Sequence, residues 1–95
     1  MVVNFVFFPP IKDGKDAEFR EWFAWSNEGL KKSEGFISRK LLKPIEGGNY
    51  TSVIEFQSHE TFMAMHSSPF HEEISKRVMP LFDGSPVPHF YEVIE

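Results

Sequence analysis

Hydrophobic residues recur with two different periods in the first third of the chain. Residues Val2–Phe8 are apolar except for Asn4, and the two prolines that follow end the run. A continuous run of β-branched and aromatic residues with a proline stop predicts a strand that is buried on both faces. Over Asp16–Lys32 the large apolar residues recur instead at intervals of three and four, which predicts an amphipathic helix. Its inward stripe consists of Phe19, Trp22, Phe23, Ser26 and Leu30.

The same signals predict three further strands and two further helices. The GGN sequence at residues 47–49 suits a hairpin turn between two strands. Ser68 followed by Pro69 is typical of a helix start, so we expect one helix to stop near His66 and another to begin just after it. The predicted strands are Phe36–Lys43, Tyr50–Phe56 and Pro88–Ile94, and the predicted helices are His59–His66 and Pro69–Met79.

The order of these elements, β-α-β-β-α-α-β, predicts the fold class. It is the order of a ferredoxin-like α+β protein, in which helices cover one face of a four-stranded antiparallel sheet. A chain of 95 residues has the length of one domain, so we expect residues 1–95 to form a single domain.

The first strand also predicts a partner. The sheet face that carries no helices should be polar if it meets water, but both sets of alternating residues in this strand are apolar. A second sheet packed on the open face would bury the additional set, and the simplest second sheet belongs to an identical chain. We therefore expect a homodimer that forms through the sheet faces. The two sets are Val2, Val6 and Phe8, and Val3, Phe5 and Phe7.

Composition and charge exclude several classes of protein. The formal net charge is −4 without a clustered basic face, so we expect no nucleic-acid partner. Cysteine is absent, which excludes disulfides and thiolate metal ligands. Residues 1–8 are too short to span a bilayer and lack the basic flank of a signal peptide, so we expect no membrane association and a cytoplasmic location.

Three stretches of the chain resemble the antibiotic biosynthesis monooxygenase (ABM) family, whose members form dimeric α/β barrels. They are FREWF at 19–23, EGFISRKLL at 34–42 and YTSVIEFQSHETFMAMHSSPFH at 50–71. The shared features are a Glu-Gly-aromatic entry into the second strand, an aromatic-x-Ser turn after the third, and a Ser-Pro-x-His restart of the last helix. The resemblance implies a ferredoxin-like fold, a homodimer and an oxygenase-type activity without a cofactor.

The diagnostic residues of two catalytic branches of that family do not match this chain. The cofactor-free oxygenases have Asn and Trp on the third strand and Tyr on the following helix, and the heme-degrading branch has Asn, Trp and His on the first strand and the last two helices. The corresponding residues here are Ser52, Phe56 and Phe62 for the first branch and Phe7, Met65 and Ser75 for the second. The resemblance therefore implies the fold and the dimer without supplying a mechanism.

His66 and His71 flank the predicted break between the last two helices and are the candidate catalytic bases. His71 lies in the first turn of a helix, where the positive helix end lowers imidazole basicity; a solvent-facing residue at a helix start is the alternative. His66 shares a helix face with Phe62 and is either a second base or part of a pocket wall. Two imidazoles without a third ligand nearby make a poor zinc site, so we expect no metal.

Asn4 is the sole polar residue of the first strand, and a buried amide needs hydrogen-bond partners. It either satisfies a strand edge or a helix end, or it points into a ligand cavity, where Asn4 or Ser52 would hold a developing oxyanion. An aromatic-rich interior with few polar groups favours a small apolar or aromatic ligand. The expected pocket residues are Trp25, Ser52, Phe56, Phe62 and Met65.

Two functions fit these features. The first is a cofactor-independent, monooxygenase-like activity on a small aromatic or quinol-type molecule held between helices and sheet, with His71 or His66 removing a proton. The second is a non-catalytic dimeric module that binds a small hydrophobic molecule. The missing diagnostic residues favour the second function, and the family resemblance favours the first.

Overall fold

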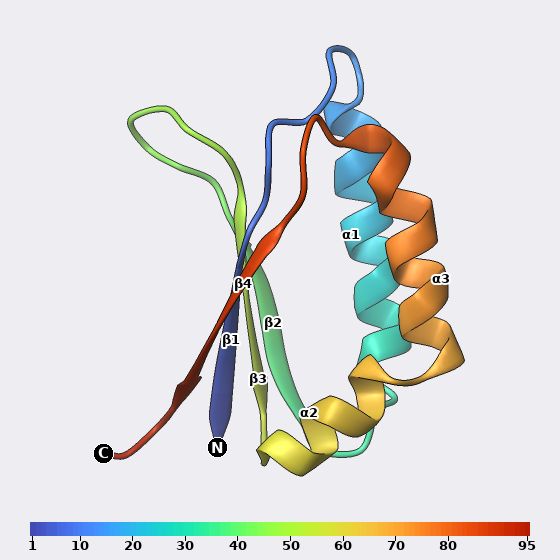
Figure 1. Ribbon diagram of the computed structural model, residues 1–95. Coiled ribbons are helices and arrows are strands. Elements are labelled where there is room, and N and C mark those ends of the chain that lie inside the picture. The colour runs from blue at the N-terminus through green and yellow to red at the C-terminus, as the bar shows by residue number, and fades with distance from the viewer.

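The computed structural model describes residues 1–95 and confirms the predicted ferredoxin-like α+β fold. One antiparallel sheet has the strand order β2-β3-β1-β4, with helices packed on one of its faces (Figure 1). The four strands and three α-helices begin and end within two residues of the predicted bounds, whereas the short 3-10 helix was not predicted. They are β1 (Val2–Phe7), α1 (Asp16–Leu30), β2 (Phe36–Leu42), β3 (Thr51–Phe56), α2 (His59–His66), α3 (Pro69–Val78), the short 3-10 helix η1 (Met79–Leu81) and β4 (Val87–Glu92).

Local hydrogen bonds produce the break between α2 and α3. Ser58 and Thr61 form a reciprocal capping box that starts α2. At the break, the Ser68 hydroxyl accepts a hydrogen bond from the His71 backbone N–H (3.2 Å) and donates one to the Met65 carbonyl oxygen (2.6 Å). Pro69 occupies the first turn of α3, where its missing N–H has no helical partner to lose. The predicted stop and restart is therefore confirmed.

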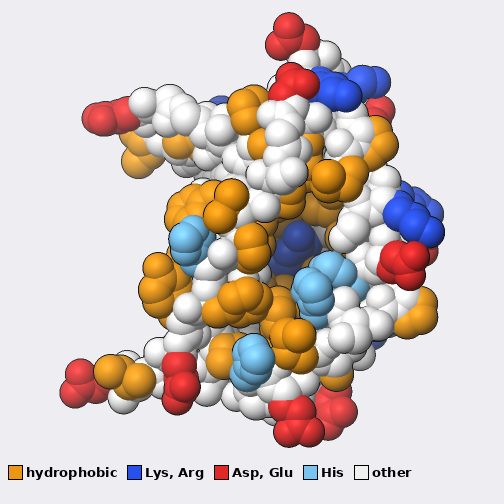
Figure 2. Space-filling view, in the orientation of Figure 1, with side chains coloured by type: hydrophobic (Ala, Val, Ile, Leu, Met, Phe, Trp, Pro, Cys, Tyr) orange, Lys and Arg blue, Asp and Glu red, His pale blue; other side chains and the backbone are white.

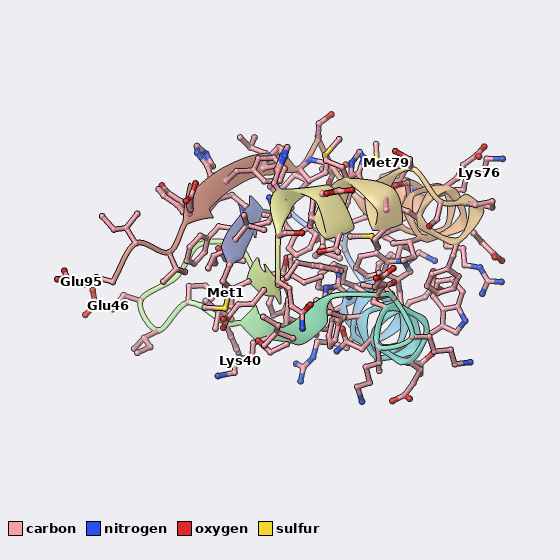
Figure 3. The ribbon with its side chains drawn as sticks, turned by 90° about the horizontal axis from the view of Figure 1, so that it is seen from below. Met1, Lys40, Glu46, Lys76, Met79 and Glu95 are labelled. Carbon is pink, nitrogen blue, oxygen red and sulfur yellow. The ribbon has the colours of Figure 1, made fainter.

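The core lies between the sheet and the helices. Phe19 of α1 and Phe56 of β3 are both completely buried, and the aromatic ring of Phe8 packs edge-on against Phe19 at a centroid distance of 5.2 Å. Side chains fill the space between the two layers when the molecule is seen from below (Figure 3). The aromatic stripe of α1 thus faces the sheet, as its sequence periodicity predicts.

The opposite face of the sheet carries no helix. Phe7, Val87 and Tyr91 are about half exposed on this face. The loop that carries Glu46 and the C-terminal residue Glu95 both extend on this side, away from the helices (Figures 1 and 3). A single chain therefore buries only one face of β1, and the second apolar face is available for contact.

Candidate functional site

A cavity of about 610 Å³ opens between the helix-covered face of the sheet and the three helices. Its size and its mostly apolar wall are typical of sites for small molecules. Figure 2 shows the hollow, with hydrophobic side chains around it, histidines at its rim and a basic side chain visible inside. No aspartate or glutamate lines the cavity. Its polar wall consists of Asn4, Arg39, Ser52, His59, His66, His71 and Ser75.

The helix break brings His66 and His71 together at this cavity. Their ring centroids are 4.3 Å apart, and His66 also stacks on Phe62 at 6.0 Å. Burial, and to a smaller extent the nearby His66 and Arg39, lower the pKa of His71 from 6.5 to about 4. The direction agrees with the sequence-based expectation, but burial and the neighbouring basic side chains are the causes rather than the helix end. His71 is therefore a neutral imidazole at pH 7.

Asn4 and Ser52 lie on neighbouring strands and face the same cavity. Both are buried, and the Asn4 amide donates one long hydrogen bond of 3.4 Å to the His89 carbonyl oxygen. Every fully buried side-chain nitrogen or oxygen in the chain has a hydrogen-bond partner. The Ser52 hydroxyl and the Asn4 amide oxygen make no side-chain hydrogen bond, so both atoms must be reachable from the cavity. Two neutral polar groups are thus available to a ligand.

Arg39 of β2 is a lining residue that the sequence-based reasoning missed. Its Nη1 donates to Ser26 Oγ (2.6 Å) and to Asn27 Oδ1 (3.0 Å), and its guanidinium lies 3.9 Å from the centre of the Phe23 ring. Burial lowers the pKa of Arg39 to about 9. One sequence signal could have revealed it: Ser26 is the one polar residue in the apolar stripe of α1, and a buried hydroxyl indicates a polar partner opposite it.

The remaining predicted pocket residues divide into two groups. Phe62 and Met65 of α2 line the cavity, whereas Phe56 and Trp25 do not. Phe56 is sealed beneath Phe36 and Phe62, whose rings pack edge-on against it. Trp25 is on the flank of the α1 stripe.

The flank position turns Trp25 toward α3 instead of the cavity. The centroids of the Trp25 and Phe70 rings are 5.3 Å apart, and the Arg77 guanidinium lies over the Trp25 ring, 4.1 Å from its centroid. Trp22 lines the cavity in its place, and its indole N–H donates to the Ile74 carbonyl oxygen (3.0 Å). Three residues of helix rotate a side chain by about 300°, which leaves Trp25 about 60° from the direction of Trp22.

Two further structural findings concern metals and membranes. The chain has no group of three or more His, Cys, Asp or Glu side chains that could hold a metal ion. None of its helices combines the length and the apolar character required to cross a membrane.

The sequence profile described as "antibiotic biosynthesis monooxygenase" matches residues 1–77 of the 95. The chain belongs to the ABM family. This match confirms the resemblance inferred from the sequence motifs. No curated protein matches the chain significantly.

Solved structures of low sequence identity share the fold of this ABM protein. A candidate antibiotic biosynthesis monooxygenase from Nitrosomonas europaea superimposes with a TM-score of 0.86 at 14% identity, with 100% of both chains covered. Another from Caulobacter crescentus gives 0.84 at 18% identity, covering 99% of this chain and 91% of that one. SnoaB, a cofactor-independent oxygenase from Streptomyces nogalater, gives 0.78 at 19% identity, again with 99% and 91% covered.

Proposed function

We propose that this ABM protein is a monooxygenase-type enzyme that oxidises a small aromatic or quinol-type molecule in the cavity without a cofactor. One observation carries the proposal: the cavity brings the paired imidazole rings of His66 and His71 together with the open polar groups of Asn4 and Ser52. Membership of the ABM family and the likeness in fold to a cofactor-independent oxygenase support it.

The proposed reaction begins with removal of a proton from an acidic CH₂ group, such as that of the keto tautomer of a phenol. His71 takes this proton, and the resulting enolate donates electrons to O₂ to form a carbon-bound hydroperoxide once a proton is returned. Loss of water from the CH–OOH group then leaves a carbonyl. The balance is one CH₂ group and one O₂ consumed, and one C=O group and one water formed.

Each lining group has a role that fits its environment. A neutral His71 has a free electron pair at pH 7, which a general base needs. An imidazole of such low pKa is a weak base in the empty cavity, and an anion that forms beside it raises its basicity. The Ser52 hydroxyl can donate a hydrogen bond to the enolate oxygen as it gains charge, and so can the N–H of the Asn4 amide that its bond to the His89 carbonyl leaves free. His66 lies against the His71 ring, at a centroid distance of 4.3 Å, and restrains its orientation by packing.

The proposal is tested by O₂ consumption with anthrone as the probe substrate. His71→Ala should lower the rate by about 10²- to 10⁴-fold, the usual contribution of a general base. His66→Ala should have a smaller effect. His89→Ala is the control, because the His89 ring packs on Phe7 on the open face of the sheet. Unchanged rates in both His71→Ala and His66→Ala would refute the assignment.

A non-catalytic binding module is the second candidate function. The chain carries Ser52, Phe56 and Phe62 where the cofactor-free branch that it resembles has its diagnostic residues, and this favours binding without turnover. Such a module would show increased melting temperature with aromatic ligands and no O₂ consumption with any of them. The two measurements together separate the candidates.

A further inference from the structure

The Arg39 guanidinium has donors that the protein does not use. A guanidinium carries five N–H donors, of which two belong to Nη1. Both Nη1 donors are taken by the neutral acceptors Ser26 and Asn27. The Nε and Nη2 donors make no hydrogen bond within the chain. Every fully buried side-chain nitrogen or oxygen does have a hydrogen-bond partner, so these two donors are not fully buried. The Nε–Nη2 edge is therefore reachable, and Arg39 lines the cavity.

Arg39 also has no counter-ion. The four ion pairs of the chain join exposed side chains within α1, within α3 or at their ends, and none includes Arg39. The cavity wall contains three histidines, one arginine and no carboxylate. A cation taken out of water without a counter-ion is costly, and such a charge is ordinarily paired. No carboxylate of this chain lines the cavity, and a bound anionic ligand would supply the missing partner.

The hydrogen bonds that Arg39 does make fix its position. Ser26 and Asn27 of α1 hold Nη1, and the Phe23 ring covers the guanidinium at 3.9 Å. A guanidinium restrained in this way presents its free edge in one direction. The Nε–Nη2 edge has the geometry that binds the two oxygens of a planar anion with parallel hydrogen bonds.

We propose that Arg39 is the specificity-determining residue of the cavity and that it selects aromatic ligands that carry a planar oxyanion. The inference rests on the proposed function in that it concerns the same cavity, and it adds the charge class of the molecule bound there. The oxyanion belongs either to a carboxylate substituent or to an ionised hydroxyl conjugated with a ring carbonyl. In the first case Arg39 orients the substrate, and in the second it contacts the electron-rich system that would react with O₂.

Binding calorimetry on the unmodified protein distinguishes these cases. The probes are 2-naphthoate against its neutral analogue 2-naphthamide, and ionised 2-hydroxy-1,4-naphthoquinone against its neutral methyl ether. We expect at least one anion to bind 10-fold or more tightly than its neutral partner. Preference for naphthoate would identify the oxyanion of the ligand as a carboxylate, and preference for the hydroxyquinone would identify it as an ionised hydroxyl. Failure of both anions to bind more tightly than their neutral partners would overturn the proposal.

Variants then test whether Arg39 is responsible. Arg39→Gln should abolish the preference for the anion, and Arg39→Lys should retain part of it because the charge remains without the planar fork. Arg77→Gln is the matched control, because Arg77 lies over Trp25 outside the cavity. Equal loss of preference in Arg77→Gln would show a diffuse charge effect and contradict the assignment to Arg39.

The binding experiment tests the Arg39 proposal and the O₂-consumption experiment tests the proposed oxidation, and either can give a negative result without the other. Anion preference without O₂ consumption would leave the Arg39 proposal standing and remove the proposed oxidation. Turnover of anthrone with no anion preference would do the reverse. If Arg39→Gln does not fold, Arg39→Lys tests the assignment instead, and a full anion preference in Arg39→Lys would contradict the role of the planar guanidinium.

Discussion

Three side chains at the cavity influence one another through charge. His71 is flanked by the His66 ring and lies within the field of Arg39, and all three carry or can carry positive charge. With no carboxylate in the wall, protonation of either histidine adds to an uncompensated positive field. The empty site therefore favours the neutral form of His71 at pH 7, and a bound anion would raise the pKa of this imidazole.

This coupling predicts how stability depends on pH. The pKa of His71 is about 4 in the folded chain and about 6.5 when unfolded, so between these values the unfolded chain binds more protons. Stability should therefore fall as the pH is lowered from 7 to 4. Urea unfolding at several pH values measures this slope, and His71→Gln should make it shallower. An unchanged slope in His71→Gln would contradict the low pKa.

A direct reading of the same pKa comes from imidazole NMR titration. The His71 signal, identified by its loss in His71→Gln, should titrate near pH 4. Its midpoint should rise in His66→Ala, because one repelling charge is removed. A midpoint near 6.5 in the unmodified protein would show that the ring is solvated.

At the scale of elements, an irregularity in β2 explains why Arg39 escaped sequence-based reasoning. Phe36 pairs with Phe56, but Ser38 then pairs with Glu55, so the register shifts between Phe36 and Ser38. A regular strand with Phe36 facing the core would direct Lys40 inward and Arg39 outward. The bulge reverses this alternation and places Arg39 opposite buried Ile54.

The other elements were predictable because each has a local cause. The break between α2 and α3 follows from Ser68 and Pro69, and the stripe of α1 follows from its periodicity. The histidine pair was identified for the same reason, since both residues adjoin that break. The contact between Arg39 and Ser26 joins β2 to α1 through tertiary packing, and no local pattern specifies it.

The contact between α1 and α3 depends on Gly29. The Phe70 ring of α3 lies over this glycine, so the Cβ of an alanine would overlap the ring. Gly→Ala in an open helix stabilises by about 1 kcal/mol. Here the overlap should dominate, and we expect Gly29→Ala to destabilise the protein by about 1–3 kcal/mol in urea unfolding.

The control for Gly29→Ala removes the ring. In a Phe70→Ala background the same change should be neutral or stabilising, because only the helix propensity remains. Destabilisation by Gly29→Ala of similar size in both backgrounds would show that Phe70 is not its cause.

At the scale of the whole molecule, a monomer leaves one apolar face of the sheet exposed. The helices and the cavity occupy one face, while Val3, Phe5 and Phe7 project from the other beside Val87 and Tyr91. Exposed apolar patches of this kind are typical of protein interfaces. We therefore retain the proposal, first made from the alternation in β1, that two copies pack through these faces.

This dimer is tested by light scattering at micromolar concentration. The expected mass is twice the 11.1 kDa of one chain. Phe7→Glu and Val87→Glu each place a charge on the open face, where both residues are about half exposed, and should shift the mass toward the monomer. Ala24→Glu is the matched control, since Ala24 is exposed on α1 on the other side of the sheet. A mass of 11.1 kDa for the unmodified protein would refute the dimer and leave the apolar face of β1 to a different partner.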